Sequence, residues 1–220
     1  MKKIIATLLL IASCAFAQSD LNNQVRKGLY FSAGYTFGHV TLNDHYNDRE
    51  SDMTYNGWLV SFFDVRLGGH ITGIFSVYGT LGIGVGTGSY EHEYKGDDLK
   101  DDATNLKGIL GVGTEITPFQ NKENPLYGLF FGICGGLAGE RVEYNYEGNE
   151  IGIMYHSDSD VAEHDIFDNF FGRIEVGYEW WVGSRWRFGS AFNYTFGAYD
   201  DGNWESITSH TFGLTLRFSR

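Results

Sequence analysis

The chain closes with residues 209–220, SHTFGLTLRFSR. From His210 to Phe218 every second residue is bulky and mostly apolar, whereas the residues between them are small or polar. Alternation with a period of two is typical of a β-strand that has one apolar face and one polar face. The apolar face could point into the core of a soluble sandwich, or outward to lipid from a membrane barrel. The rest of the sequence must decide between these two folds.

The first 17 residues, MKKIIATLLLIASCAFA, have the pattern of a secretory signal peptide. Lys2 and Lys3 precede an apolar run, and a small-x-small cleavage site ends at Ala17. The apolar run is shorter than the ~20 residues that a membrane-spanning helix needs. The stretch LIASC also fits a lipoprotein box, so processing at Cys14 is the alternative. With cleavage after Ala17, Cys134 is the only cysteine left, and we interpret its thiol as a packing group.

The pattern predicts a signal peptide over residues 1–17, a periplasmic segment over 18–28 and one β-barrel domain over 29–220. The 30 glycines, 14 tyrosines and 17 phenylalanines suit twisted strands joined by turns. Each period-two run is at least as long as the ~9–11 residues that a tilted strand needs to cross a bilayer. The predicted strands are 29–41, 56–67, 74–90, 106–117, 126–142, 169–182, 186–198 and 207–218.

The connections between these runs alternate in character. Those at 68–73, 118–125 and 183–185 are short and contain turn-forming residues. Those at 42–55, 91–105, 143–168 and 199–206 are mostly longer, and together they hold 21 acidic residues and three basic ones. Long loops at one end, short turns at the other and an even strand count are typical of outer-membrane barrels. The sequence therefore predicts an all-β, eight-stranded antiparallel up-and-down transmembrane β-barrel with four long extracellular loops and short periplasmic turns.

The polar faces of the predicted strands combine glycines with charged side chains, which suits a narrow interior filled by side chains. Five residues of each sign fall on these faces, and buried charges must be paired because an isolated one costs several kcal/mol. The sequence thus predicts a closed, ion-paired lumen. The predicted lumen charges are Asp64, Arg66, Lys107, Glu115, Glu140, Arg173, Glu175, Glu179, Arg187 and Arg217.

The final strand resembles the signal by which outer-membrane barrels are handed to their assembly machinery. Its pattern of polar, glycine, apolar and aromatic positions is carried by Thr211, Gly213, Leu216 and Phe218. The whole mature chain resembles the small eight-stranded outer-membrane barrels of the OmpA, OmpX and OmpW kind. One departure is that two residues, Ser219 and Arg220, follow the aromatic residue on which the family usually ends.

The resemblance implies a monomer in the outer membrane of a Gram-negative-type envelope. It implies contact with outer-membrane lipid, lipopolysaccharide and the barrel assembly machinery, and neither a cofactor nor nucleic acid. The chain has no peptidoglycan-binding module after the final strand, so a cell-wall tether is not implied.

Two motifs invite a binding-site interpretation. The stretch GIGVGTG at 82–88 continues into SYEHEY without a helical pattern, so we interpret its glycines as close lumen packing and not as a phosphate loop. The stretch HSDSDVAEHD at 156–165 contains candidate Ca²⁺ or Zn²⁺ ligands but lacks the glycine and spacing of a calcium loop. A solvated acidic loop is the simpler interpretation, with divalent cations bridging to anionic lipopolysaccharide. The metal candidates are His156, Asp158, Asp160, His164 and Asp165.

His39 and His210 fall on the lipid-facing side of the first and last strands, which are neighbours in a closed barrel. We interpret them as interfacial residues. Barrel enzymes that deacylate lipid A carry a His-x-Ser pair on a strand, and this sequence contains none. The favoured hypothesis is therefore a non-enzymatic structural or surface-interaction barrel. The alternatives are a lipid-modifying barrel enzyme, a narrow channel for small solutes and a secreted ligand-binding barrel of the lipocalin type.

Overall fold

The computed structural model describes residues 28–45, 53–94, 97–146, 149–153, 169–182, 186–200 and 206–220. Regular structure in these ranges is entirely β. The strands are β1 (Gly28–His45), β2 (Met53–His70), β3 (Phe75–Tyr94), β4 (Asp97–Ile116), β5 (Leu129–Tyr146), β6 (Asn149–Ile153), β7 (Phe170–Val182), β8 (Trp186–Asp200) and β9 (Ser206–Ser219).

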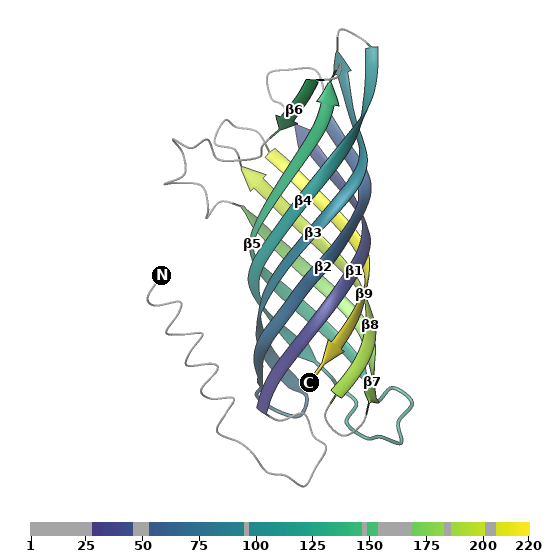
Figure 1. Cartoon of the computed structure of the whole chain (residues 1–220). Helices are drawn as coiled ribbons and strands as arrows, with labels where there is room; N and C mark the ends of the chain where they lie inside the picture. Colours follow the sequence, from purple (N-terminus) through teal and green to yellow (C-terminus); the bar gives the residue numbers. More distant parts are fainter. Residues whose placement is uncertain are drawn as a thin grey trace.

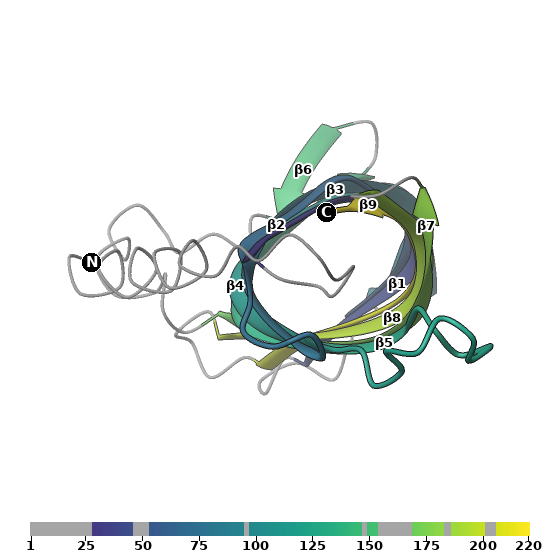
Figure 2. The same cartoon turned by 90° about the horizontal axis from the view of Figure 1, so that it is seen from below.

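Eight of these strands close into a ring. Each of them pairs antiparallel with its two neighbours in the order β1, β2, β3, β4, β5, β7, β8, β9, and β9 pairs with β1. Figure 1 shows the tilted strands from the side, and Figure 2 shows the ring end-on. The prediction of an eight-stranded antiparallel barrel is therefore confirmed.

The ninth strand, β6, lies outside the ring (Figure 2). It forms a hairpin with the end of β5, with residue pairs from Val142↔Ile153 to Tyr146↔Asn149. This hairpin belongs to the connection 143–168, which the sequence predicts as a loop. The connection therefore carries an ordered extension of the barrel wall.

The prediction of a loop over residues 91–105 is wrong. Strands β3 and β4 pair without a register shift from Phe75↔Ile116 to Tyr94↔Asp97, so only residues 95–96 join them. The run of charges reads as a loop because it lacks an apolar face. A strand pair outside the bilayer needs no such face, since its backbone hydrogen bonds form in water as well. The result is a hairpin that projects past the ring (Figure 1).

At the opposite end of the barrel the connections include the turn 71–74 and the segment 117–128. The second is longer than the predicted turn 118–125, and β5 begins at Leu129. Hydrogen bonds from the amides of Tyr127 to Asn124 O and of Leu129 to Leu126 O hold residues 124–129 in a turn. Gly128 has a φ of 110°, a conformation that favours glycine, which explains why the strand starts later than predicted.

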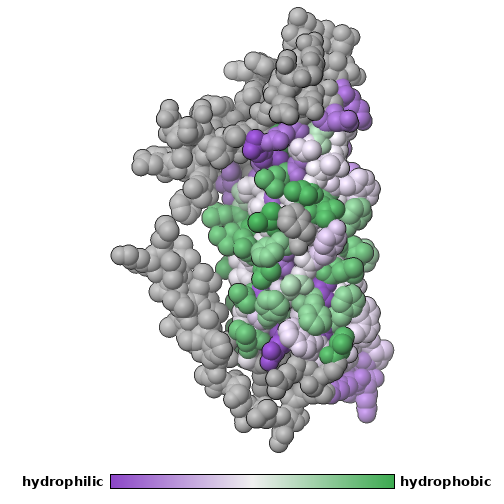
Figure 3. All heavy atoms as spheres, viewed as in Figure 1, coloured by the Kyte–Doolittle hydropathy of each residue, from purple (hydrophilic) through white to green (hydrophobic). Residues whose placement is uncertain are grey.

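The outer face of the ring is apolar. In β9, Phe212, Leu214, Leu216 and Phe218 are 41–63% exposed, whereas Thr211, Thr215 and Arg217 between them are buried. Figure 3 shows hydrophobic side chains over the middle of the barrel and hydrophilic ones towards its ends. The apolar face of β9, the last strand of the ring, thus points outward.

A β-bulge in β2 adjusts which residues face out. Gly34 pairs with Asp64 and Thr36 with Ser61, so β2 carries one extra residue at this point. Strict alternation from Asp64 would place Trp58 in the lumen, but the bulge puts both Trp58 and Phe63 on the outer face. A bulge is the usual means of changing the facing residues within one strand.

Among the residues that the structure describes, no helix is long and apolar enough to cross a membrane. The closed antiparallel ring combines an apolar exterior with charged side chains inside. This is the arrangement of the transmembrane barrels of outer membranes. The protein therefore has the fold of an outer-membrane β-barrel.

Candidate functional site in the barrel lumen

All ten charged residues that the sequence places on the polar faces lie inside the barrel. Their exposed fractions range from 0% for Glu115 to 8% for Arg173. Ion pairs connect them in two groups. The larger group, which we term the lumen network, consists of Asp64, Arg66, Glu115, Arg173, Glu175, Glu179, Arg187 and Arg217.

Strands β2 and β7 stand opposite each other in the ring, four strands apart in either direction. The guanidinium of Arg66 on β2 donates two hydrogen bonds to the carboxylate of Glu175 on β7, at 2.5 and 2.9 Å. In the reverse sense, Nη1 of Arg173 on β7 donates to Oδ2 of Asp64 on β2 at 2.7 Å. Side chains from opposite walls therefore meet in the middle of the lumen.

Strands β4 and β9 are also opposite each other, and Arg217 of β9 connects them. Its Nη2 donates to Oε2 of Glu115 on β4 at 2.7 Å, and its Nε donates to Oε1 of Glu179 at 2.8 Å. Its Nη1 lies 3.5 Å from Oε1 of Glu175, which links this contact to the β2–β7 contact. The lumen network thus also connects the opposite strands β4 and β9.

Glu179 closes the network on the β7–β8 side. Its Oε2 accepts a hydrogen bond from Nη1 of Arg187 at 2.9 Å, and its Oε1 accepts one from Ser219 Oγ at 2.7 Å. Four arginines and four carboxylates therefore form one continuous, neutral set. Neutral pairing is what allows such charges to remain buried.

Aromatic rings pack against the arginines. The guanidinium carbon of Arg217 lies 3.5 Å from the ring centroid of Phe130, and that of Arg66 lies 5.1 Å from the ring centroid of Tyr78. Tyr30 donates to Oε2 of Glu115 at 3.3 Å. Flat rings stacked on guanidinium groups contribute cation–π attraction and fill space around the ion pairs.

The smaller ionic group is Lys107 with Glu140, whose atoms lie 3.0 Å apart. Lys107 also reaches the opposite wall, where it donates to Ser209 Oγ at 2.9 Å and to Thr211 Oγ1 at 3.2 Å. Asn105 donates to Glu140 at 2.7 Å. This group bridges β4 and β9 a second time.

Part of the lumen is apolar, a feature that the positions of the charged residues do not predict. The buried apolar side chains lie mainly on the strand segments next to the long connections. In these segments apolar residues occur on both faces of the strand. Alternation alone therefore does not show which of the two faces points inward. They include Val40, Leu42, Leu59, Ile109, Ala138, Val142, Phe171 and Ile207.

Other predicted candidates have separate locations. Residues 82–88 form part of the inner and outer faces of β3, and Gly82, Gly84 and Gly86 are buried, as lumen packing requires. His210 accepts or donates a hydrogen bond with Tyr194 at 2.7 Å, and His39 lies edge-on to Trp58. His39 pairs in register with Phe212 and His210 with Thr41, and each histidine belongs to an outward aromatic cluster.

The predicted metal candidates at 156–165 lie outside the described residues, as do the signal peptide and the segment 18–27. Within the ranges that the structure describes, no group of three or more His, Cys, Asp or Glu side chains could hold a metal ion. Cys134 is a free, buried thiol in the lumen. A metal site at 156–165 thus stays a prediction.

The predicted assembly-signal residues alternate between the two faces of β9. Thr211 is buried in the lumen, whereas Leu216 and Phe218 are exposed on the outer face. Phe218 stacks on Trp186 of β8, with ring centroids 4.7 Å apart. The strand thus presents an apolar outer edge at the barrel's closing seam.

Comparison with known proteins finds no matching protein-family model and no matching curated protein. Three solved structures have a similar fold. Ail, the attachment invasion locus protein of Yersinia pestis, is 9% identical over 85% of this chain and 97% of that chain, with a TM-score of 0.40. The outer membrane protease OmpT from Escherichia coli is 8% identical over 93% and 99%, with a TM-score of 0.48.

The outer membrane protein OprG from Pseudomonas aeruginosa is 9% identical over 87% of this chain and 96% of that chain, with a TM-score of 0.38. OprG and OmpT are outer-membrane proteins by name, and the names of Ail and OmpT describe different roles. At these identities the likeness concerns the fold. The role must therefore be argued from the geometry of this chain.

Proposed function

We propose that this protein is a closed outer-membrane barrel that acts at the cell surface as a structural or surface-interaction protein. The observation that carries the proposal is the direct bonding between opposite walls, from Arg66 to Glu175 and from Arg217 to Glu115. An eight-stranded ring has an interior just wide enough for side chains to fill. Here those side chains meet at hydrogen-bond distance across the whole lumen.

A permeating ion or solute would have to separate these pairs. Removing one partner of a buried, paired charge costs about 3–5 kcal/mol, so several crossing pairs form a high barrier to passage. The apolar residues of the lumen add a segment without ligands for an ion. The narrow-channel alternative is therefore disfavoured by the same contacts that support the closed barrel.

The surface role is supported by what projects beyond the ring. The β3–β4 hairpin extends through Tyr94↔Asp97, and the β5–β6 hairpin extends through Tyr146↔Asn149. In the four stretches that the sequence predicts as long connections, acidic residues outnumber basic ones by 21 to three. A rigid barrel that carries acidic extensions suits contact with divalent cations or with a basic partner surface.

Planar-bilayer recording tests the closed lumen. We expect wild-type protein, checked for folding by heat-modifiable mobility, to insert without a steady unitary conductance, whereas a porin reconstituted in parallel conducts. Liposomes that contain the protein should not swell in small sugars. Reproducible unitary steps from the wild-type barrel would replace this proposal with the narrow channel.

Mass spectrometry of lipid A tests the non-enzymatic part of the proposal. Cells with and without the protein should yield the same acylation pattern. A mass difference equal to one acyl chain, present only with the protein, would favour the lipid-modifying enzyme.

A further inference from the structure

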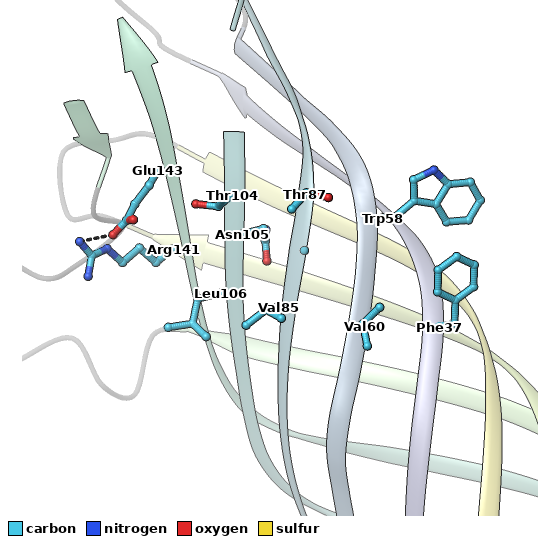
Figure 4. Close-up of a pocket in the computed structure, with 11 residues that line it drawn as sticks. Phe37, Trp58, Val60, Val85, Thr87, Thr104, Asn105, Leu106, Arg141 and Glu143 are labelled. Atoms are coloured by element: carbon cyan, nitrogen blue, oxygen red, sulfur yellow. Dashed lines mark ion pairs between the residues drawn. The ribbon is translucent and has the colours of Figure 1, made fainter. Parts of the chain in front are cut away.

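A groove runs along the outer face of the barrel over strands β1 to β5 (Figure 4). It occupies a volume of about 780 Å³. One wall is the stacked pair Phe37 and Trp58, whose ring centroids are 5.0 Å apart with an interplanar angle of 8°. The other wall is the ion pair of Arg141 with Glu143. The residues of both walls lie on the outer face of their strands.

The strand register arranges the side chains between the walls in two rows. The row nearer the barrel middle is apolar and runs from Val60 to Val85 to Leu106. The row nearer the long loops is small and hydroxylated, with Thr87 paired to Thr104. Along the strands, the groove therefore changes from an apolar surface to a polar one.

The apolar end of the groove continues as a shallow track. Gly108 and Gly139 pair in register directly below Leu106 and Arg141, on the outer face. A Cβ atom added at either glycine would meet nothing within 4 Å, so the surface there is open. Flanked by Ile83 of β3, which is 40% exposed, this track offers room for a flexible hydrocarbon chain.

Arg141 places a cation beside this apolar track. Its side chain is 42% exposed, and one terminal nitrogen pairs with Glu143. Among the residues that the structure describes, its Nε is buried and has no hydrogen-bond partner. Because the side chain is partly exposed, the terminal part of the guanidinium can donate to a phosphate oxygen at the surface.

We propose that this groove binds one phosphorylated glycolipid of the outer leaflet. An acyl chain lies on the apolar row and the glycine track, the phosphate is held by Arg141, and the sugar lies against Trp58, Thr87 and Thr104. The change from apolar to polar along the strands matches the change from chain to headgroup in such a lipid. Aromatic faces and hydroxyl groups are suited to a sugar ring, and a guanidinium to a phosphate.

Native mass spectrometry of the folded full-length protein, mixed with bisphosphorylated lipid A in detergent, tests the site. Thr104→Trp fills the groove, and Arg141→Gln removes the phosphate donor. Each is expected to lower lipid retention by about tenfold or more, which corresponds to ~1.4 kcal/mol. Folding of every variant is checked by heat-modifiable mobility, and Arg141→Gln decides the test if Thr104→Trp folds poorly.

Two matched controls are available. Thr114→Trp places the same ring on the same outer face of β4, paired with Val77 near the other end of the strand. Lys100→Gln breaks an exposed ion pair with Glu91 outside the groove. Both controls should retain lipid A like the wild type. Equal retention by the Thr104→Trp and Thr114→Trp variants would overturn the proposal.

Competition identifies the ligand. Dephosphorylated lipid A and phosphatidylglycerol should each displace bound lipid A poorly, because one lacks the phosphate and the other lacks the sugar. Displacement by phosphatidylglycerol at equal concentration would show a general anionic-lipid surface and contradict the glycolipid site. A lipid-free dimer cross-linked through the groove would show that a second copy occupies it instead. None of these outcomes depends on whether the lumen conducts.

Discussion

Arg66 of β2 and Glu175 of β7 bond to each other across the full width of the barrel, through two hydrogen bonds of 2.5 and 2.9 Å. Contacts between neighbouring strands would leave the centre of the ring open. Contacts between strands that face each other occupy the centre. The Arg66–Glu175 contact therefore lies where an open pore would have its central space.

Arg217 forms ion pairs with three carboxylates of the lumen network. Arg217→Gln should lower the free energy of unfolding by about 3–5 kcal/mol, because it removes a buried cation that pairs with three buried carboxylates. Urea unfolding in lipid vesicles measures this loss. Lys100→Gln, which breaks an exposed pair, should cost less than ~1 kcal/mol in the same assay. Equal effects of the two variants would contradict a buried network.

Gly132 leaves room for the carboxylate of Glu175. A Cβ atom at this position would meet the side chain of Glu175, whereas at Gly139, on the same strand, it would meet nothing within 4 Å. Gly132→Ala should therefore lower the free energy of unfolding by about 1–3 kcal/mol through overpacking. Gly139→Ala should change it by no more than ~0.5 kcal/mol. A similar result for both glycines, measured by urea unfolding, would mean that Glu175 has other space available.

The faces of the strands could be predicted from the sequence because alternation specifies them directly. Once Phe212 to Phe218 are assigned to lipid, Arg217 must lie inside, and the same reasoning places Arg173, Glu175 and Glu179 in the lumen. Which charge meets which could not be predicted. That depends on the tilt and stagger of the ring, which set the level at which side chains of β2 and β7 face each other and are not encoded in any one strand.

Three other features could not be predicted from the alternation of apolar and polar residues. The bulge in β2 that turns Trp58 outward breaks the alternation on which the prediction depends. The β3–β4 hairpin past Ser89 has charges where the rule expects apolar residues. The outer groove combines residues from five strands, and single-strand periodicity gives no information on where neighbouring side chains are small.

Phe218 should matter for assembly, because it completes the apolar outer face of β9 and packs on Trp186. Phe218→Ala is expected to reduce the folded fraction of the protein in the outer membrane. Heat-modifiable mobility in membrane fractions measures this fraction. Phe192→Ala removes an exposed phenylalanine from the outer face of β8 and should have less effect. Equal yields for both variants would remove Phe218 from the assembly signal.

The orientation of the barrel can be tested by proteolysis of intact cells. We expect cleavage within 143–168, on the side of the long loops, and protection of 118–125, on the side of the short turns. Lysed cells provide the control in which 118–125 becomes accessible. Cleavage at 118–125 in intact cells would reverse the orientation.

The most direct test of the closed lumen is a double-mutant cycle between Arg66 and Glu175. Arg66→Gln, Glu175→Gln and the double variant are unfolded in urea in lipid vesicles, and the coupling free energy is taken from the four stabilities. A bond across the lumen predicts a coupling of at least ~1.5 kcal/mol, as for other close charge pairs. The surface pair Arg141 and Glu143 provides the matched cycle, with an expected coupling of less than ~1 kcal/mol. Additive effects at Arg66 and Glu175, within ~0.5 kcal/mol, would mean that the two side chains do not meet and that the lumen is not closed in this way.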